Sequence, residues 1–260
     1  MAADHAVNDE AQHTASTVRS IERAFEILEV LRESRAPLRL SDIARASGNH
    51  LATTQRIVNV LVRYGYAFQE RNDYSIGITS LLNAHSYLIS NRYTQAALPV
   101  VQELVRTSGL AASFSVRVEL RQILLMRIEG INALRYQLPI GEPMPLHLGG
   151  ARILAAALTS DELDMLLKNL PEITLANGGT LTRDEFVESL RVIREQGYVC
   201  GYSQRELGAA SAAVPVLNGE GEVIASLQLS GMAEEFEDGK MEWCVAELKR
   251  ASARIEKWIR

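Results

Sequence analysis

The pattern of hydrophobic and polar positions divides the first 80 residues into short, well-separated elements. Residues 18–34 place apolar side chains at helical spacing, with Glu and Arg opposite, which predicts an amphipathic helix. Residues 36–48 predict a loop and a short helix that stops at a glycine, and residues 51–64 predict a third helix. Residues 66–78 then alternate around a polar turn, which predicts a β-hairpin. This is the order of a winged helix-turn-helix, whose second paired helix lies in the major groove of DNA.

The third of these helices has two unlike faces. One side is apolar, whereas the other carries Ala52, Arg56, Asn59 and Arg63, with Gln55 on its flank and no acidic residue. Amides can pair bidentately with adenine, arginine binds guanine or phosphate, and alanine can contact a thymine methyl group. The alternative is a solvated helix face, but such a face usually mixes in Glu and Lys. The pattern therefore favours a DNA-recognition helix.

Charge and composition set the limits for this interpretation. The chain has 260 residues and a net charge of −5, yet residues 16–80 carry nine Arg against seven acids. This positive patch is modest, so tight DNA binding requires a dimer or a higher oligomer. The length suits two domains, and no run of about 18 apolar residues predicts a membrane span. The two cysteines lie far apart, as expected for reduced thiols of a cytoplasmic protein without a metal or cofactor.

The N-terminal segment resembles the DNA-binding domain of the IclR family of bacterial transcriptional regulators. The positions that fit the family pattern are Ser20, Arg23, Ala24, Ile27, Leu28, Ile43, Ala44, Gly48, Thr53, Arg56, Leu61, Gly65, Tyr66, Tyr74 and Gly77. The usual Leu-Pro-Lys-Ser is replaced by residues 49–52, Asn-His-Leu-Ala, so the resemblance implies the docking mode but a different operator sequence. Pattern and resemblance together predict DNA contacts from Ser20, Arg23, Asn49, His50, Ala52, Thr53, Gln55, Arg56, Asn59 and Arg71.

Beyond residue 80 the spacing of hydrophobic residues is first helical and then, from residue 110, alternates as in strands. An amphipathic linker helix is predicted over residues 80–97, and Pro99 marks the expected start of the next helix. Further on, strands are predicted at 110–118, 121–130, 133–141, 211–218 and 221–231, and helices around 151–158, 160–169, 183–195 and 239–258. Thr182 and Glu185 form a capping box at the start of the third of these helices. This is an α+β domain, and the resemblance, which continues to about residue 232, implies a GAF-like effector-binding fold.

Strand alternation places polar residues together on one face of this predicted sheet. Ser226, Gln228 and Ser230 share a face, as do Ser211 and Ala213 in the preceding strand. Hydroxyls and an amide offer uncharged hydrogen bonds, suited to a carboxylate, carbonyl or phenol, although the pattern alone also fits a solvent-facing sheet. The resemblance implies that these strands line an effector pocket, with Pro-Leu-His at 145–147 opening its loop and His147 structural. The predicted effector-binding residues are Gly149, Ser211, Ala213, Ser226, Gln228 and Ser230.

We therefore expect a disordered tail (1–15), a winged helix-turn-helix domain (16–79), a linker helix (80–97) and an effector-binding domain (98–260). The expected function is sequence-specific binding of double-stranded operator DNA, most simply as a repressor of a catabolic operon controlled by a small organic or aromatic acid. An activator of the same kind is the alternative. An enzyme is disfavoured because the sequence has no GxSxG, HExxH or GxxxxGK motif and few histidines. The hydrophobic side of the linker helix predicts a homodimer, and the resemblance implies a homotetramer; no membrane partner is expected.

Overall fold

The computed structural model describes residues 2–132, 139–168, 170 and 172–259, with side chains from residue 18 onward. The chain forms two compact units, Met1–Tyr87 and Leu88–Arg260. Among the described residues, no helix combines the length and apolar character needed to cross a membrane.

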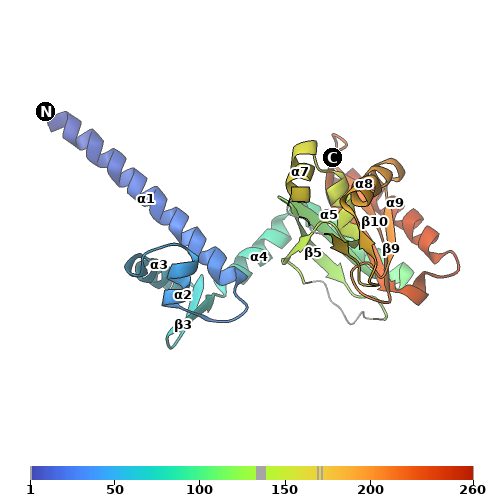
Figure 1. Ribbon diagram of the computed structural model, residues 1–260, viewed down its shortest axis with the longest axis horizontal. Helices are drawn as coiled ribbons and strands as arrows, with labels where there is room; N and C mark the ends of the chain where they lie inside the picture. Colours follow the sequence, from blue (N-terminus) through green and yellow to red (C-terminus); the bar gives the residue numbers. More distant parts are fainter. Residues whose placement is uncertain (1, 133–138, 169, 171, 260) are drawn as a thin grey trace. The chain divides into compact units, whose positions relative to one another are not determined.

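The N-terminal unit is a three-helix bundle with a small sheet (Figure 1). Its elements are α1 (Ala2–Glu33), β1 (Leu38–Arg39), α2 (Leu40–Ala46), α3 (Leu51–Arg63), β2 (Ala67–Glu70), β3 (Asp73–Ile76) and the greater part of α4 (Thr79–Ser90). The strands pair antiparallel in the order β1-β3-β2, which gives the predicted hairpin. The core consists of Ile27, Leu31, Ile43, Val58, Leu61, Ala67 and Tyr74.

The α1 helix differs from the sequence prediction at its beginning. Its backbone is helical from Ala2, whereas the sequence predicts a disordered tip over residues 1–15. Five alanines among these fifteen residues favour helix, because alanine has the highest helix propensity.

The C-terminal unit is built on a six-stranded antiparallel sheet in the order β6-β5-β4-β11-β10-β9. The strands are β4 (Ala111–Val118), β5 (Arg121–Ile128), β6 (Pro143–Pro145), β9 (Val199–Tyr202), β10 (Ala209–Leu217) and β11 (Val223–Met232). A separate pair joins β7 (Ile173–Thr174) to β8 (Thr180–Leu181). The helical elements are α5 (Arg92–Ser108), η1 (Gly149–Ala151), α6 (Arg152–Ala156), α7 (Ser160–Lys168), α8 (Arg183–Gln196), η2 (Ala233–Phe236) and α9 (Lys240–Ile259).

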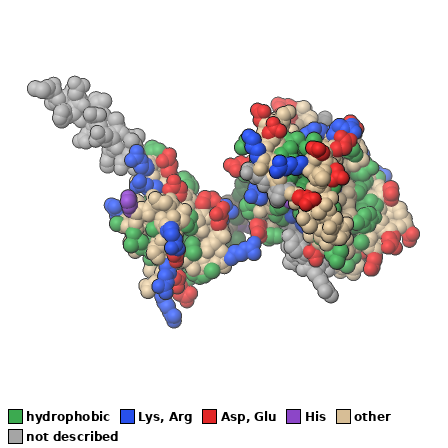
Figure 2. Space-filling view, viewed as in Figure 1, with side chains coloured by type: hydrophobic (Ala, Val, Ile, Leu, Met, Phe, Trp, Pro, Cys, Tyr) green, Lys and Arg blue, Asp and Glu red, His purple; other side chains and the backbone are tan. Residues whose placement is uncertain are grey.

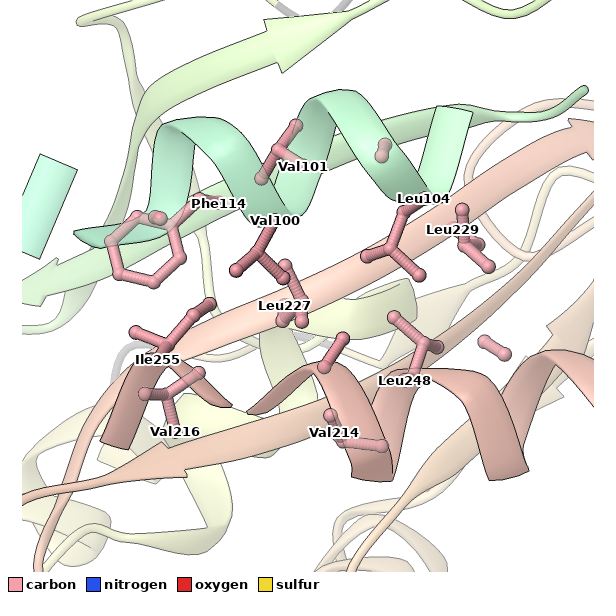
Figure 3. Packing of buried hydrophobic residues seen from close by; sticks show 14 of the residues in the cluster. Val100, Val101, Leu104, Phe114, Val214, Val216, Leu227, Leu229, Leu248 and Ile255 are labelled. Carbon is pink, nitrogen blue, oxygen red and sulfur yellow. The ribbon is translucent and has the colours of Figure 1, made fainter. Parts of the chain in front are cut away.

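Both faces of the large sheet are covered, each by a different set of helices. On one face α5 and α9 pack against the strands, and Figure 3 shows Phe114, Leu227 and Val214 pointing into this layer. A second core lies around α6 and α8, where Leu154, Phe186 and other apolar residues are buried. A sheet covered in this way has no solvent-facing side at its centre.

Two predicted helix boundaries shift in the structure. Instead of one linker helix over residues 80–97, α4 ends at Ser90 and α5 begins at Arg92. The Asn91 side chain accepts hydrogen bonds from the backbone N–H groups of Tyr93 and Thr94, which caps a new helix there. Pro99 therefore lies inside α5 and does not mark its start.

The remaining predictions for this unit mostly agree with the structure. The capping box of Thr182 and Glu185 is present at the start of α8. The sequence does not predict the short strands β6, β7, β8 and β9. The strand predicted at 133–141 falls largely on residues 133–138, which lie outside the described residues.

Candidate nucleic-acid interface and ligand pocket

The third helix presents the two faces that its sequence predicts. Thr54, Val58 and Leu61 are buried in the core of the N-terminal unit. The Thr54 hydroxyl donates to the backbone oxygen of His50 at 3.2 Å, so this buried polar group is satisfied within the helix. The opposite face is thereby turned outward.

The outward face of α3 carries an ordered set of polar side chains. Ala52, Arg56, Asn59 and Arg63 are exposed. Gln55 Nε2 donates to Asn59 Oδ1 at 2.9 Å, so the two amides are held side by side. This leaves the Gln55 oxygen as an acceptor and the Asn59 amide group as a donor, the combination that an adenine edge requires.

The other predicted DNA-contacting residues lie on α1, at the start of α3 and at the turn of the β2–β3 hairpin. Ser20 is exposed on α1, where Arg23 is half-buried; His50 is exposed immediately before α3, and Thr53 is half-buried in its first turn. Arg71 is exposed at the tip of the β2–β3 hairpin, in the left-handed region with φ = 56°. On the visible face of this unit, Figure 2 shows arginine side chains in a column with acidic ones interleaved.

One acidic side chain lies beside this surface, which the sequence did not predict. Asn49 Nδ2 donates to Glu26 Oε2 at 3.1 Å and to the Ser47 oxygen at the same distance. Glu26 is 23 residues away on α1, so only the fold brings it to the start of α3.

The polar sheet face of the C-terminal unit lies inside that unit. Ser226, Gln228 and Ser230 on β11 are buried, as the second core and the η1 turn cover this side. The Ser226 hydroxyl donates to the Gly150 oxygen at 3.2 Å. The solvent-facing interpretation of this strand pattern is therefore excluded.

A pocket opens between this face and the η1 turn, with about 550 Å³ of empty space including the part open to solvent. Four of the predicted effector-binding residues line the pocket: Gly149, Ser211, Gln228 and Ser230. The other two, Ala213 on β10 and Ser226 on β11, do not line it. The complete lining is Gln122, Arg127, Gly149, Gly150, Gly201, Gln204, Arg205, Glu206, Ala209, Ala210, Ser211, Gln228 and Ser230.

Gln228 is held against the backbone of η1. A Cβ at Gly150 would lie 2.1 Å from Gln228 Oε1 and 2.9 Å from Ala213 Cβ, so only glycine fits this position. Within the described residues Gln228 makes no hydrogen bond, although only 9% of it is exposed. Its amide therefore has a donor and an acceptor available to a ligand.

The pocket also contains charges, which corrects the prediction of an uncharged polar lining. Arg127 Nη1 donates to Ser230 Oγ at 3.2 Å, and its guanidinium forms two bonds to Glu129 at 2.6 and 3.0 Å. Arg205 and Glu206 also line the pocket.

A β-bulge explains why the sequence pattern does not predict Arg127 and Gln122 as pocket residues. Five positions separate them, so strict alternation puts them on opposite faces of β5. The pairing shifts where Phe114 opposes Met126 and Ser115 opposes Leu124, which leaves one extra residue in β5. Both side chains then face the pocket, and Gln122 Nε2 donates to Ser115 Oγ at 2.8 Å.

His147 lies near the pocket without lining it. Burial lowers the pKa of its imidazole, and the charges of Arg205 and Arg121 lower that pKa further. It is neutral at pH 7 and half-buried, which agrees with a structural role.

Two family models match the chain in the order of its two units. The model for the IclR helix-turn-helix domain matches residues 20–71, and the model for the C-terminal domain of the bacterial transcriptional regulator IclR matches residues 85–257. The chain belongs to the IclR family. The fold class and the family predicted from the sequence are thus confirmed, and this IclR-family protein is a transcriptional regulator with a DNA-binding domain and an effector domain.

Curated relatives match nearly the whole chain, and solved structures share its fold. The regulator XynR of Escherichia coli is 28% identical over 244 residues, covering 92% of this chain and 96% of XynR. The transcriptional repressor IclR of Escherichia coli is 23% identical, covering 86% and 84%. An IclR regulator from Alicyclobacillus acidocaldarius shares the fold with a TM-score of 0.78 at 22% identity, covering 93% and 99%. An IclR homologue from Microbacterium hydrocarbonoxydans, solved with 4-hydroxybenzoate, gives 0.75 at 23% identity with the same coverage.

Proposed function

We propose that this IclR-family protein is a repressor of a catabolic operon whose DNA affinity changes when a small carboxylic acid binds in the effector pocket. The observation that carries the proposal is the pocket itself, which is lined by the unbonded amide of Gln228 and by Ser211. Such a space, walled by a few convergent polar groups, is typical of a small-molecule site. Several relatives are named repressors, and one solved homologue was crystallised with an aromatic acid.

The DNA-binding surface in this proposal is the outward face of α3. Arg56 contributes charge for a DNA phosphate, and Gln55 and Asn59 contribute the paired amides for base edges. The hairpin tip with Arg71 and the α1 residues Ser20 and Arg23 flank the helix and supply backbone contacts. The acidic Glu26 neutralises part of the adjacent surface, which adds to the need for several copies of the domain.

Assembly follows from apolar surface that the single chain leaves uncovered. Leu81 and Leu82 on α4 are 63% and 60% exposed, and Phe25 on α1 is 63% exposed. No residue of α4 is buried. Side chains of this size, exposed in groups, mark protein–protein contact surfaces. We therefore propose a homodimer formed through the N-terminal half, and a homotetramer as a pair of such dimers.

We expect the selected operator to consist of two half-sites. One winged helix reads only a few base pairs, so a dimer needs two related half-sites at a spacing set by its geometry. Selection of bound duplexes from a random pool, followed by sequencing, checks this, and sedimentation velocity at micromolar concentration gives the mass. Leu81→Glu with Leu82→Glu should reduce that mass, whereas the exposed control Asn83→Glu on the same helix should not. A monomeric wild-type chain, or a selected site without internal repetition, contradicts the proposed assembly.

A further inference from the structure

Arg152, at the start of α6, is a buried cation with little compensation. Only 7% of it is exposed, and within the described residues no carboxylate lies within 4.0 Å of its guanidinium. Its Nε is buried and has no hydrogen-bond partner there, while its Nη2 donates to Gln204 Oε1 at 2.9 Å. Burial lowers the pKa of this guanidinium. By contrast, the buried Arg127 guanidinium is paired with Glu129.

The contact with Arg152 fixes which end of the Gln204 amide faces the pocket. A guanidinium has only donors, so the Gln204 oxygen must point toward Arg152 and the NH2 group must point away from it. Gln204 lines the pocket, and its Nε2 donates no hydrogen bond to the residues that the structure describes. The amide rests on Gly201, where a Cβ would lie 2.2 Å from Nε2. Arg152 thus holds a donor in place at the pocket wall.

We infer that Arg152, acting through Gln204, makes the effector pocket select a carboxylate over the corresponding amide. The inference rests on the proposed function in that it assumes the pocket is the effector site. Arg152 does not line this pocket, so it is a positioning residue.

The selectivity follows from matching donors to acceptors. A carboxylate has only acceptors, and it can receive hydrogen bonds from Gln204 Nε2, from Gln228 and from the guanidinium of Arg205 that lines the same wall. A carboxamide has a single oxygen, so when that oxygen accepts from Gln204 Nε2 its NH2 group lies against the guanidinium of Arg205, or the reverse. The uncompensated charge of Arg152 behind Gln204 further favours an anion in the pocket.

The test measures binding of small acids and their matched amides to the full chain by calorimetry. The probes are benzoate with benzamide, 4-hydroxybenzoate with 4-hydroxybenzamide, and pyruvate with pyruvamide. We expect at least one acid to bind at least tenfold more tightly than its amide. If every acid that binds is matched in affinity by its amide, or if the chain binds none of the acids, the inference is overturned.

Variants of Arg152 test whether this residue orients the Gln204 amide or only stabilises the fold. Arg152→Met should lower the acid-to-amide affinity ratio at least fivefold, and Arg152→Lys, which keeps donors beside Gln204, should restore much of it. Arg194→Met is the matched control, because Arg194 donates to the Ala156 backbone near the same helix outside the pocket. An unchanged ratio in a folded Arg152→Met chain overturns the inference.

A second variant covers the case in which Arg152→Met does not fold. Gln204→Glu gives Arg152 a carboxylate partner and removes the Nε2 donor, so the unliganded chain should melt at a higher temperature and bind the acid at least tenfold more weakly. Acid binding at wild-type strength in this variant contradicts the inference. None of these measurements involves DNA, so loss of the proposed regulatory role and loss of the acid selectivity are distinguishable.

Discussion

Replacing Gln228 with leucine is expected to weaken binding of the acid effector by roughly 5- to 150-fold. Gln228 presents an unbonded donor and acceptor to the pocket, and losing a partner for a ligand group costs about 1–3 kcal/mol. Leucine is similar in size and apolar, so the buried position beside Gly150 stays filled and the sheet is retained. DNA affinity without effector should not change, because the substitution lies in the other unit.

Calorimetric titration of Gln228→Leu with the acid that binds the wild-type chain most tightly measures this loss. Gln196→Leu is a suitable control, since this half-buried amide donates to the Tyr198 backbone and does not line the pocket. Equal acid affinity in the Gln228→Leu and wild-type chains places the effector site elsewhere.

Replacing Arg56 with alanine is expected to weaken DNA binding to all sequences alike. Loss of one phosphate contact should reduce the slope of log affinity against log salt by about one unit. Asn59→Ala, on the same exposed face, should instead relax the preference at one base pair by about 1–3 kcal/mol. The difference arises because phosphate contacts carry no sequence information, whereas base-edge contacts do.

Fluorescence anisotropy over a range of salt concentrations, with the selected duplex and single-base variants of it, separates the two effects. Arg106→Ala removes the same charge from an exposed position on α5 and should leave both quantities unchanged. If folded Arg56→Ala and Asn59→Ala chains bind every duplex as the wild type does, α3 is not the recognition helix.

Local periodicity explains which parts of the sites were predictable. The two faces of α3 follow from a 3.6-residue period, and the shared face of Ser226, Gln228 and Ser230 follows from strict alternation in β11. Both are properties of short, regular segments. The start of α5 was not predicted, because the Asn91 cap determines that boundary and overrides the proline signal at residue 99.

The site features that the sequence does not predict depend on contacts between distant segments. Arg127 reaches the pocket face only because the bulge in β5 shifts its register, and no local pattern indicates a bulge there. Arg152 and Gln204 are 52 residues apart, so their hydrogen bond and the orientation it imposes depend on the folded sheet. The sequence pattern does not predict a charged pocket, because contacts between distant segments bring its charged residues together.

The most direct test of effector-controlled DNA binding is the coupling between the two ligands, measured in both directions. Anisotropy gives the affinity for the selected duplex with and without saturating acid, and calorimetry gives the acid affinity with and without saturating duplex. Coupled sites must change each other's affinity by the same factor, which is about 5 to 150 in typical cases. We predict equal factors in this range, with the acid lowering the affinity for DNA. An acid that binds the pocket while both factors equal one would contradict effector control of this regulator.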